Sequence, residues 1–158
     1  MIREITFTLN GEERKVAVEP NDLLLDVLRD KLGIKSPKYG CGRGDCGTCT
    51  IVFNGTTARS CIMLAVEADG QTIETLEGLG RDGLTTLQEE FIARNSFQCG
   101  YCAPGMILAA TELLENNAAP SDEEIKEAIA GNLCRCTGYT AIIEAIKAAA
   151  EKLSAKAS

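Results

Sequence analysis

Three cysteines lie close together in the first third of the chain, with a spacing that suits an iron–sulfur cluster. Cys41, Cys46 and Cys49 form a C-x4-C-x2-C pattern, and a fourth cysteine, Cys61, follows them. The triplet has the spacing of plant-type [2Fe–2S] sites. Zinc sites more often use cysteine pairs about two to four residues apart, and two disulfides are the other alternative. The spacing predicts a [2Fe–2S] cluster held by these four thiolates.

Glycines around these cysteines support the same interpretation. Gly40, Gly42, Gly44 and Gly47 lie within or beside the C-x4-C-x2-C segment. A loop that wraps a cluster needs positive φ angles and a close approach of the backbone, and glycine permits both. The N–H groups of such a loop can point at the sulfurs, offset their negative charge and tune the reduction potential. We expect these four glycines to form the cluster loop.

The other four cysteines form two shorter pairs. Cys99 and Cys102 are a C-x2-C pair just before Pro104, and Cys134 and Cys136 are a C-x-C pair before the last predicted helix. Each pair would lie at a helix N-terminus, where free N–H groups and the helix dipole favour thiolates. A four-cysteine zinc site is the alternative, because C-x2-C also occurs in zinc knuckles. We predict a second [2Fe–2S] cluster here.

The composition agrees with metal binding. The 158 residues include eight cysteines and no histidine, which excludes a Rieske centre, a mixed Cys/His zinc site and a histidine general base within the chain. A net charge of −7 argues against nucleic acid or an anionic membrane as the main partner. No apolar run is long enough to span a bilayer, and the N-terminus carries charge where a signal peptide is apolar. We therefore expect a cytoplasmic protein, in which thiolates serve as metal ligands rather than disulfides.

The first cysteine group must be positioned by β structure. Alternating apolar residues predict a strand over 5–9, and Asn10-Gly11 is a turn signal before a second strand over 16–18. An apolar stripe predicts a helix from Pro20-Asn21 to Gly33. A hairpin over 51–59 and a last strand over 73–76 complete a small α+β domain, which we place at residues 1–78.

The second cysteine group must be positioned by helices. Capping pairs are expected at Thr86 with Glu89 and at Ser121 with Glu124, and Pro104 suits a first helical turn. The predicted helices cover residues 86–95, 104–116, 121–131 and 139–153, followed by a frayed tail over 154–158. Two helical hairpins favour a four-helix bundle, which we place at residues 79–158.

Three motifs, in this order, resemble those of a known family. They are Cys41-Gly-Arg-Gly-Asp-Cys46-Gly-Thr-Cys49, Cys99-Gly-Tyr-Cys102-Ala-Pro-Gly-Met106 and Gly131-Asn-Leu-Cys134-Arg-Cys136-Thr-Gly-Tyr139. Together they resemble the small iron–sulfur subunit of molybdenum hydroxylases, the xanthine oxidase family, which includes carbon monoxide dehydrogenase, nicotinate dehydrogenase and 4-hydroxybenzoyl-CoA reductase. The resemblance implies a ferredoxin-like β-grasp domain followed by a four-helix domain, each with one cluster.

The resemblance also implies partner subunits with their own cofactors. A large subunit carries molybdopterin, usually as the cytosine dinucleotide in bacteria, and a medium subunit carries FAD, in a dimer of heterotrimers. Electrons would pass from the molybdenum site to the second cluster, then to the first cluster and to flavin, and the direction reverses in a reductase. The chain would be the iron–sulfur subunit of an oxidoreductase complex and would hold no substrate site of its own.

Two further residues are implied by their positions in the matching motifs. Gln98 matches a glutamine that hydrogen-bonds the pterin, and Cys136 matches the cysteine ligand beside the pterin. Without the resemblance, Gln98 would be interpreted as a polar residue at a helix end that faces water. Ala103 departs from the threonine of many members, and this difference leaves the ligands intact.

Two other classes of protein compete with this interpretation. A free-standing two-cluster ferredoxin would need neither a cluster in a helical bundle nor a glutamine placed for a pterin. A structural zinc protein would lack iron and sulfide. The substrate of the complex cannot be inferred from this chain, because the substrate pocket would lie on the large subunit.

Overall fold

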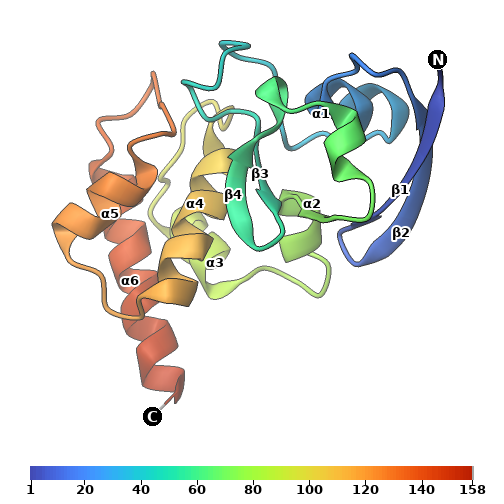
Figure 1. Ribbon diagram of the computed structural model, residues 1–158. Helices are drawn as coiled ribbons and strands as arrows, with labels where there is room; N and C mark the ends of the chain where they lie inside the picture. Colours follow the sequence, from blue (N-terminus) through green and yellow to red (C-terminus); the bar gives the residue numbers. More distant parts are fainter. Residues whose placement is uncertain (158) are drawn as a thin grey trace.

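The computed structural model describes residues 1–157 and has a mixed sheet at one end and helices at the other (Figure 1). The five strands lie in the order β2-β1-β5-β3-β4, with β5 parallel to β1 and the other pairs antiparallel. Their bounds are β1 Arg3–Leu9, β2 Glu12–Val18, β3 Thr50–Phe53, β4 Thr56–Arg59 and β5 Thr72–Glu74. The sheet and the helices confirm the predicted α+β class.

Both predicted hairpins are present, because their turn residues adopt the required conformations. Asn10 and Gly11 have φ angles of 52° and 79°, and Asn54 and Gly55 have 51° and 84°. Positive φ at both central residues is the signature of a two-residue turn whose twist matches the flanking strands. The second strand is longer than predicted, since β2 pairs with β1 along its whole length.

The segment between β2 and β3 differs from the prediction. The first helix begins at α1, Leu24–Asp26, rather than at Pro20-Asn21, and continues as a π-helical segment, η1, Val27–Lys31. Gly33, with φ of 72°, ends it as predicted. Two short 3₁₀ helices, η2 Ser60–Ile62 and η3 Ala65–Ala68, lie between β4 and β5.

The strand predicted over 73–76 ends two residues early. After β5 the chain enters a short helix, α2, Leu76–Leu79, which leads towards the helical half. The predicted domain boundary at residues 78 and 79 therefore falls within α2, and the boundary itself remains a prediction.

Four longer helices follow α2. They are α3 Thr86–Ala93, α4 Ala103–Asn116, α5 Asp122–Ile129 and α6 Thr140–Ala157. The capping box at Ser121 and Glu124 is confirmed, but α3 is capped by Thr85 with Gln88, one residue before the predicted pair. The prediction of a frayed tail over 154–158 is wrong as far as residue 157, because α6 continues to Ala157. Residue 158 lies outside the described residues. None of the helices within residues 1–157 is long and apolar enough to cross a membrane.

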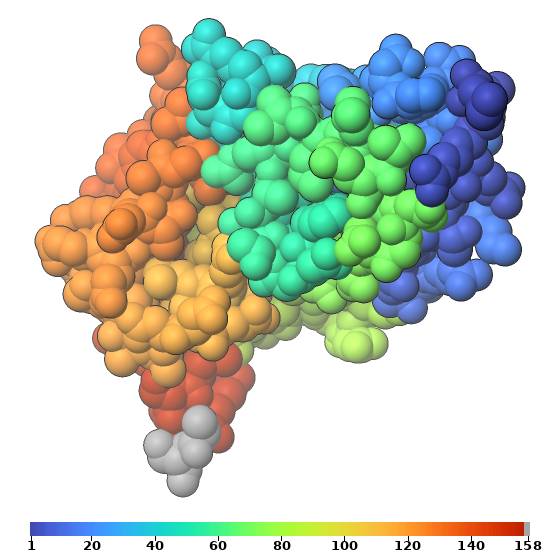
Figure 2. Space-filling view, in the orientation of Figure 1, coloured from blue at the N-terminus to red at the C-terminus, as the bar shows by residue number. Residues whose placement is uncertain are grey.

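The sheet and the helices meet along α4, which packs against β3 and β4. Thr57 of β4 donates its hydroxyl to the Glu112 carboxylate on α4 at 2.6 Å. The surface of the first cysteine loop (cyan) lies beside the surface of the loop before α6 (orange), as Figure 2 shows. A backbone hydrogen bond of 2.9 Å from Leu133 N to Cys46 O joins the two loops. The two groups of cysteines are thereby brought to one side of the molecule.

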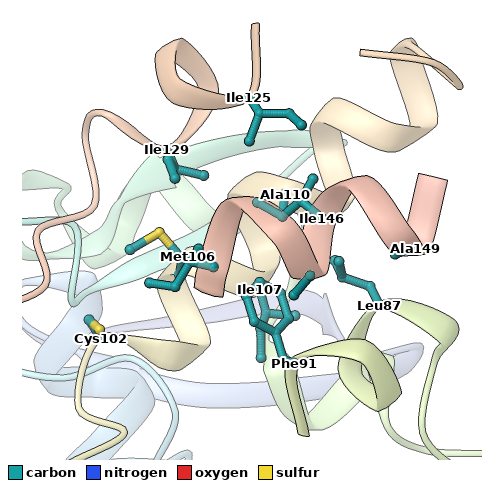
Figure 3. Packing of buried hydrophobic residues seen from close by; sticks show 12 residues of the cluster. Leu87, Phe91, Cys102, Met106, Ile107, Ala110, Ile125, Ile129, Ile146 and Ala149 are labelled. Carbon is teal, nitrogen blue, oxygen red and sulfur yellow. The ribbon is translucent and has the colours of Figure 1, made fainter. Parts of the chain in front are cut away.

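Each half has one large apolar cluster of its own. Figure 3 shows the helical cluster, in which large side chains of α3, α4 and α5 point towards α6. Alanines such as Ala110 and Ala149 let the helices approach closely, and Met106 is fully buried at the end of α4 near Cys102. Because Cys102 belongs to this cluster, the helical core fixes the position of one predicted ligand directly.

Glu77 of α2 ties this junction to the segment before the first cysteine loop. Its carboxylate accepts the backbone N–H groups of Lys35 and Ser36 at 2.9 Å each, together with the Ser36 and Thr75 hydroxyls. Burial tends to raise the pKa of Glu77, but the hydrogen bonds from Ser36 and Thr75 outweigh it and lower the pKa to about 2. A depressed pKa in the folded state means that this carboxylate stabilises the fold above the ordinary pKa of 4.5 and loses this effect as the pH falls towards 2.

Glu77→Gln should lower stability at pH 7 by about 1–2 kcal/mol, a value reduced for solvent screening because Glu77, although its carboxylate is partly desolvated, is still open to water. This corresponds to a fall of about 4 °C in the thermal midpoint. The measurement is the midpoint by circular dichroism at pH 7 and pH 3.5, where the difference from the unsubstituted protein should shrink. Glu74→Gln, on an exposed residue of β5, is the control. An equal difference at both pH values would contradict this role of Glu77.

Candidate iron–sulfur centres

The first cysteine loop directs backbone N–H groups at sulfur. Cys41 Sγ accepts from the N–H groups of Asp45 at 3.2 Å, Cys46 at 3.4 Å and Arg43 at 3.5 Å. The N–H of Cys41 in turn points at Cys46 Sγ at 3.3 Å. Hydrogen bonds from Arg43 and then Cys46 lower the pKa of Cys41 to about 6. The loop therefore favours the thiolate, which is the form that binds a metal.

Glycine makes this loop conformation accessible. Gly42, Gly44 and Gly47 have φ angles of 66°, 87° and 76°, as expected for a loop that turns its N–H groups inward. Gly40 has no positive φ and serves the other expected purpose. A Cβ there would lie 2.6 Å from Cys46 Sγ, so only glycine permits this close approach.

Cys49 and Cys61 lie deeper in the first half. Cys49 is next to β3 and Cys61 is in η2, and both are buried in contact with Leu25 of α1. Burial raises the pKa of the Cys49 thiol to about 11, and the charge of Arg59 opposes this rise. Cys49 thus occupies an apolar site in which a metal would have to displace its proton.

The second group of cysteines forms two facing pairs between helix ends. Cys136 Sγ lies 3.5 Å from Cys99 Sγ, and both side chains are exposed. Cys102, the residue before α4, is buried beside Cys134. Burial raises the pKa of Cys102 to about 12, and the neighbouring Cys134 thiol adds to this rise. The helical hairpins bring both predicted pairs together.

Polar groups after Cys136 form hydrogen bonds with Cys134. Its sulfur accepts from the Thr137 hydroxyl at 3.1 Å and the Thr137 N–H at 3.4 Å. Its own N–H donates to the Tyr139 hydroxyl at 2.7 Å. Tyr139, with φ of 66°, precedes α6, which begins at Thr140 rather than at residue 139 as predicted. The sequence interpretation missed both roles, although the position of these hydroxyl residues directly after the C-x-C pair was a signal.

Gln98 lies on the rim of the second group. It is exposed, and its Nε2 donates to Cys136 O at 3.1 Å. This bond orients the Gln98 side chain beside the exposed pair Cys99 and Cys136. The position of Gln98 is thus that of a polar group at the outer edge of the cysteines, where a partner could reach it.

A cavity of about 260 Å³ opens between the two loops. Six of the eight cysteines line it, namely Cys41, Cys46, Cys99, Cys102, Cys134 and Cys136. Within residues 1–157, no three His, Cys, Asp or Glu side chains converge on the place of a single metal ion. A [2Fe–2S] cluster, by contrast, is held by four thiolates spread over two irons. The all-thiol donor set, the N–H groups aimed at sulfur and the available space fit such clusters.

The two halves of the chain match two family models. Residues 7–80 match the 2Fe-2S iron-sulfur cluster binding domain, and residues 75–147 match the [2Fe-2S] binding domain. The nicotinate dehydrogenase small FeS subunit of Eubacterium barkeri is 52% identical over 149 residues, which cover 94% of this chain and 95% of that protein. The chain therefore belongs to the family of small iron–sulfur subunits of molybdenum hydroxylases.

Solved structures agree with this assignment. Quinoline 2-oxidoreductase from Pseudomonas putida 86 superposes with a TM-score of 0.93 at 45% identity, covering 98% of this chain and 97% of that chain. The aldehyde oxidoreductase of Desulfovibrio desulfuricans superposes with a TM-score of 0.92 at 42% identity, but this chain covers only 17% of that longer one. The chain is an electron-transfer subunit of an oxidoreductase complex, with two [2Fe–2S] clusters and larger partner subunits. A free-standing ferredoxin has less support.

Proposed function

We propose that the chain relays electrons between molybdopterin on a large subunit and FAD on a medium subunit. Its first cluster would be held by Cys41, Cys46, Cys49 and Cys61, and its second by Cys99, Cys102, Cys134 and Cys136. Each cluster, when bound, stores and releases one electron at a time. The observation that carries the proposal is the meeting of both cysteine groups on one side of the molecule, joined by the bond from Leu133 N to Cys46 O.

That hydrogen bond links the two proposed clusters by a short path of covalent bonds and one hydrogen bond. Cys46 is a proposed ligand of the first cluster, and Leu133 directly precedes Cys134, a proposed ligand of the second. Tyr101, which also lines the cavity, donates its hydroxyl to Tyr39 O at 2.5 Å. Two bonds between the loops therefore hold the ligand segments at a fixed separation. The cluster loop itself would be formed by Gly40, Gly42, Gly44 and Gly47.

The exposed pair Cys99 and Cys136 supports a docking side for the large subunit. Burial divides the second group into an inner pair, Cys102 and Cys134, and this outer pair. Gln98, on the same rim, would hydrogen-bond the pterin, and Cys136 would lie beside it. Electrons would therefore cross the subunit boundary at the outer pair.

The assembly we propose is a dimer of heterotrimers in the cytoplasm, with molybdopterin cytosine dinucleotide and FAD on the partners. The relatives' names support separate subunits, since they include a nicotinate dehydrogenase small FeS subunit and a nicotine 6-hydroxylase small subunit. The longer aldehyde oxidoreductase shows the same fold as part of a larger chain. The reaction and its substrate would belong to the large subunit.

Purification from the native host should recover this chain together with two larger subunits. The complex should contain iron, acid-labile sulfide, molybdenum and flavin, and the reduced complex should give two distinct [2Fe–2S] EPR signals. Recovery of the fully loaded chain alone, exchanging electrons with a flavoprotein at a diffusion-limited rate, would favour a free-standing ferredoxin. Intact, anaerobically handled protein without labile sulfide would contradict both clusters.

A further inference from the structure

Arg59 lies where the two cysteine groups meet, and the proposed electron relay assigns it no role. It is the last residue of β4, directly opposite Thr50 of β3. Thr50 follows Cys49, and Arg59 is two residues before Cys61. The guanidinium therefore comes from the strand pair that the two buried ligands of the first cluster flank.

The guanidinium reaches from this strand pair to the loop of the second cluster. Its Nη1 donates to Thr50 Oγ1 at 2.6 Å, and its Nη2 donates to Gly131 O at 2.8 Å. A Cβ on Gly131 would lie 2.5 Å from Arg59 Nη2, so the guanidinium packs directly against that backbone. Asn132, the next residue, is buried with its Oδ1 at 3.1 Å from Thr50 Oγ1. Arg59 is consequently half-buried and held in one position.

The positive charge of Arg59 is not neutralised by a carboxylate. Both of its hydrogen-bond partners are neutral oxygens, and no ion pair within residues 1–157 includes it. Five other arginines do pair with carboxylates, namely Arg3, Arg14, Arg43, Arg81 and Arg94. The charge of Arg59 therefore acts on its surroundings without a counter-charge beside it.

A fixed cation near an iron–sulfur cluster favours the reduced form. The four thiolates make the cluster anionic, and reduction adds a further negative charge, which a nearby cation stabilises. The effect is larger in a half-buried position than in water, because screening is weaker there. Arg59 should act more strongly on the first cluster, whose ligands Cys49 and Cys61 flank its own strand pair, than on the second.

We propose that Arg59 raises the reduction potential of the first cluster relative to the second, and that its bond to Gly131 O holds the two ligand loops in register. This inference rests on the proposed assignment of the ligands. Its consequence is a driving force for electrons to move from the second cluster to the first. Arg59 would be a residue that tunes and positions the relay without being a ligand.

The test is a redox titration of the purified complex followed by the two EPR signals. Arg59→Gln should lower the ratio of reduced to oxidised first cluster at a fixed potential by about fivefold. For a one-electron couple, in which tenfold is about 59 mV, this is about 40 mV. The second cluster should change by less than twofold. Arg59→Lys, which keeps the charge, should leave the first cluster within about twofold of the unsubstituted protein.

Two controls separate charge from structure. Thr50→Val removes the hydroxyl that accepts from Nη1 but keeps the guanidinium, so the potential of the first cluster should stay near its original value. Arg14→Gln removes a cation on β2, at the far edge of the sheet, and should shift neither signal. A shift in Thr50→Val or Arg59→Lys as large as that in Arg59→Gln would overturn the charge role, and so would an unchanged potential in Arg59→Gln.

Arg59→Gln could fail to assemble the first cluster, which a deficit of iron and sulfide would reveal. In that case Asn132→Asp decides the question, because it places a carboxylate of the same size against Thr50 Oγ1, the atom that accepts from the guanidinium. It should lower the potential of the first cluster, and an unchanged potential would overturn the inference. Two normal EPR signals in the unsubstituted complex with no shift in the variants would refute only the role of Arg59. Fewer than two signals in the unsubstituted complex would refute the proposed function and this inference with it.

Discussion

Cys134→Ser should leave the assembled complex with one [2Fe–2S] EPR signal instead of two. The proposed second cluster depends on Cys134, whose sulfur accepts two hydrogen bonds from Thr137 and lies beside the buried Cys102. A serine hydroxyl has a shorter reach and is a poorer ligand for iron than a thiolate. Iron and acid-labile sulfide should fall to about half, and electron flow from molybdenum to flavin should fall to background.

The matching control is Cys61→Ser, which should remove the other signal. That variant should still allow the molybdenum site to reduce the second cluster, while transfer to flavin is lost. The measurements are EPR of the reduced complex and stopped-flow absorbance of flavin after substrate is added. Survival of both signals in Cys134→Ser would show that the assignment of ligands is wrong. Loss of the second cluster's signal alone in Cys61→Ser would refute the division of cysteines between the clusters.

The cysteine ligands were the part of the site that could be predicted from the sequence. Ligand spacing within each short segment is local, so C-x4-C-x2-C and the two short pairs could be recognised without knowing the fold. The meeting of Cys99 with Cys136 at 3.5 Å depends on the helical hairpins, and capping residues and Pro104 predicted those hairpins well. The assignment of Cys61 to the first group followed only from its order in the chain, and the structure buries it beside Cys49.

The contacts that join the two halves could not have been predicted. Arg59 and Gly131 are 72 residues apart, and their bond links a side chain to a backbone carbonyl that any residue possesses. Thr50 and Asn132 form part of the same contact across 82 residues. No periodicity or charge pattern marks such partners, because they depend on how α4 packs against the sheet. Sequence patterns give local structure, whereas this contact is set by tertiary packing.

Competing local interactions explain the smaller errors in the predicted fold. The apolar stripe that predicted a helix from Pro20 includes buried Val27 and Leu28, but the helix begins only at Leu24 and widens into a π segment. The strand predicted up to Leu76 ends at Glu74, because buried Thr75 bonds with Asn10 and the chain then turns into α2. In both places the pattern was correct about the type of element and wrong about where it begins or ends.

The methyl group added by Gly47→Ala should damage the contact between the two cluster loops more than any other added methyl group considered. Gly47 is buried with φ of 76°, and its Cβ would lie 2.4 Å from Gly131 O and 2.4 Å from Asn132 Oδ1. The backbone carbonyl cannot move aside as the end of a side chain can. The left-handed φ alone costs about 1–2 kcal/mol, and overpacking adds about 1–3 kcal/mol.

Gly55→Ala separates these two contributions. Gly55 has a φ of 84° in the β3–β4 turn, and its Cβ would have no neighbour within 4 Å. It should therefore cost only the left-handed conformation, and both EPR signals should remain normal. Gly47→Ala should have a thermal midpoint lower than that of Gly55→Ala by about 2–12 °C, and its separated loops should weaken the magnetic interaction between the reduced clusters. If the two variants behaved alike, the halves would not be held by close packing at Gly47, and the bond from Leu133 N to Cys46 O would lose its structural basis as the connection between the clusters.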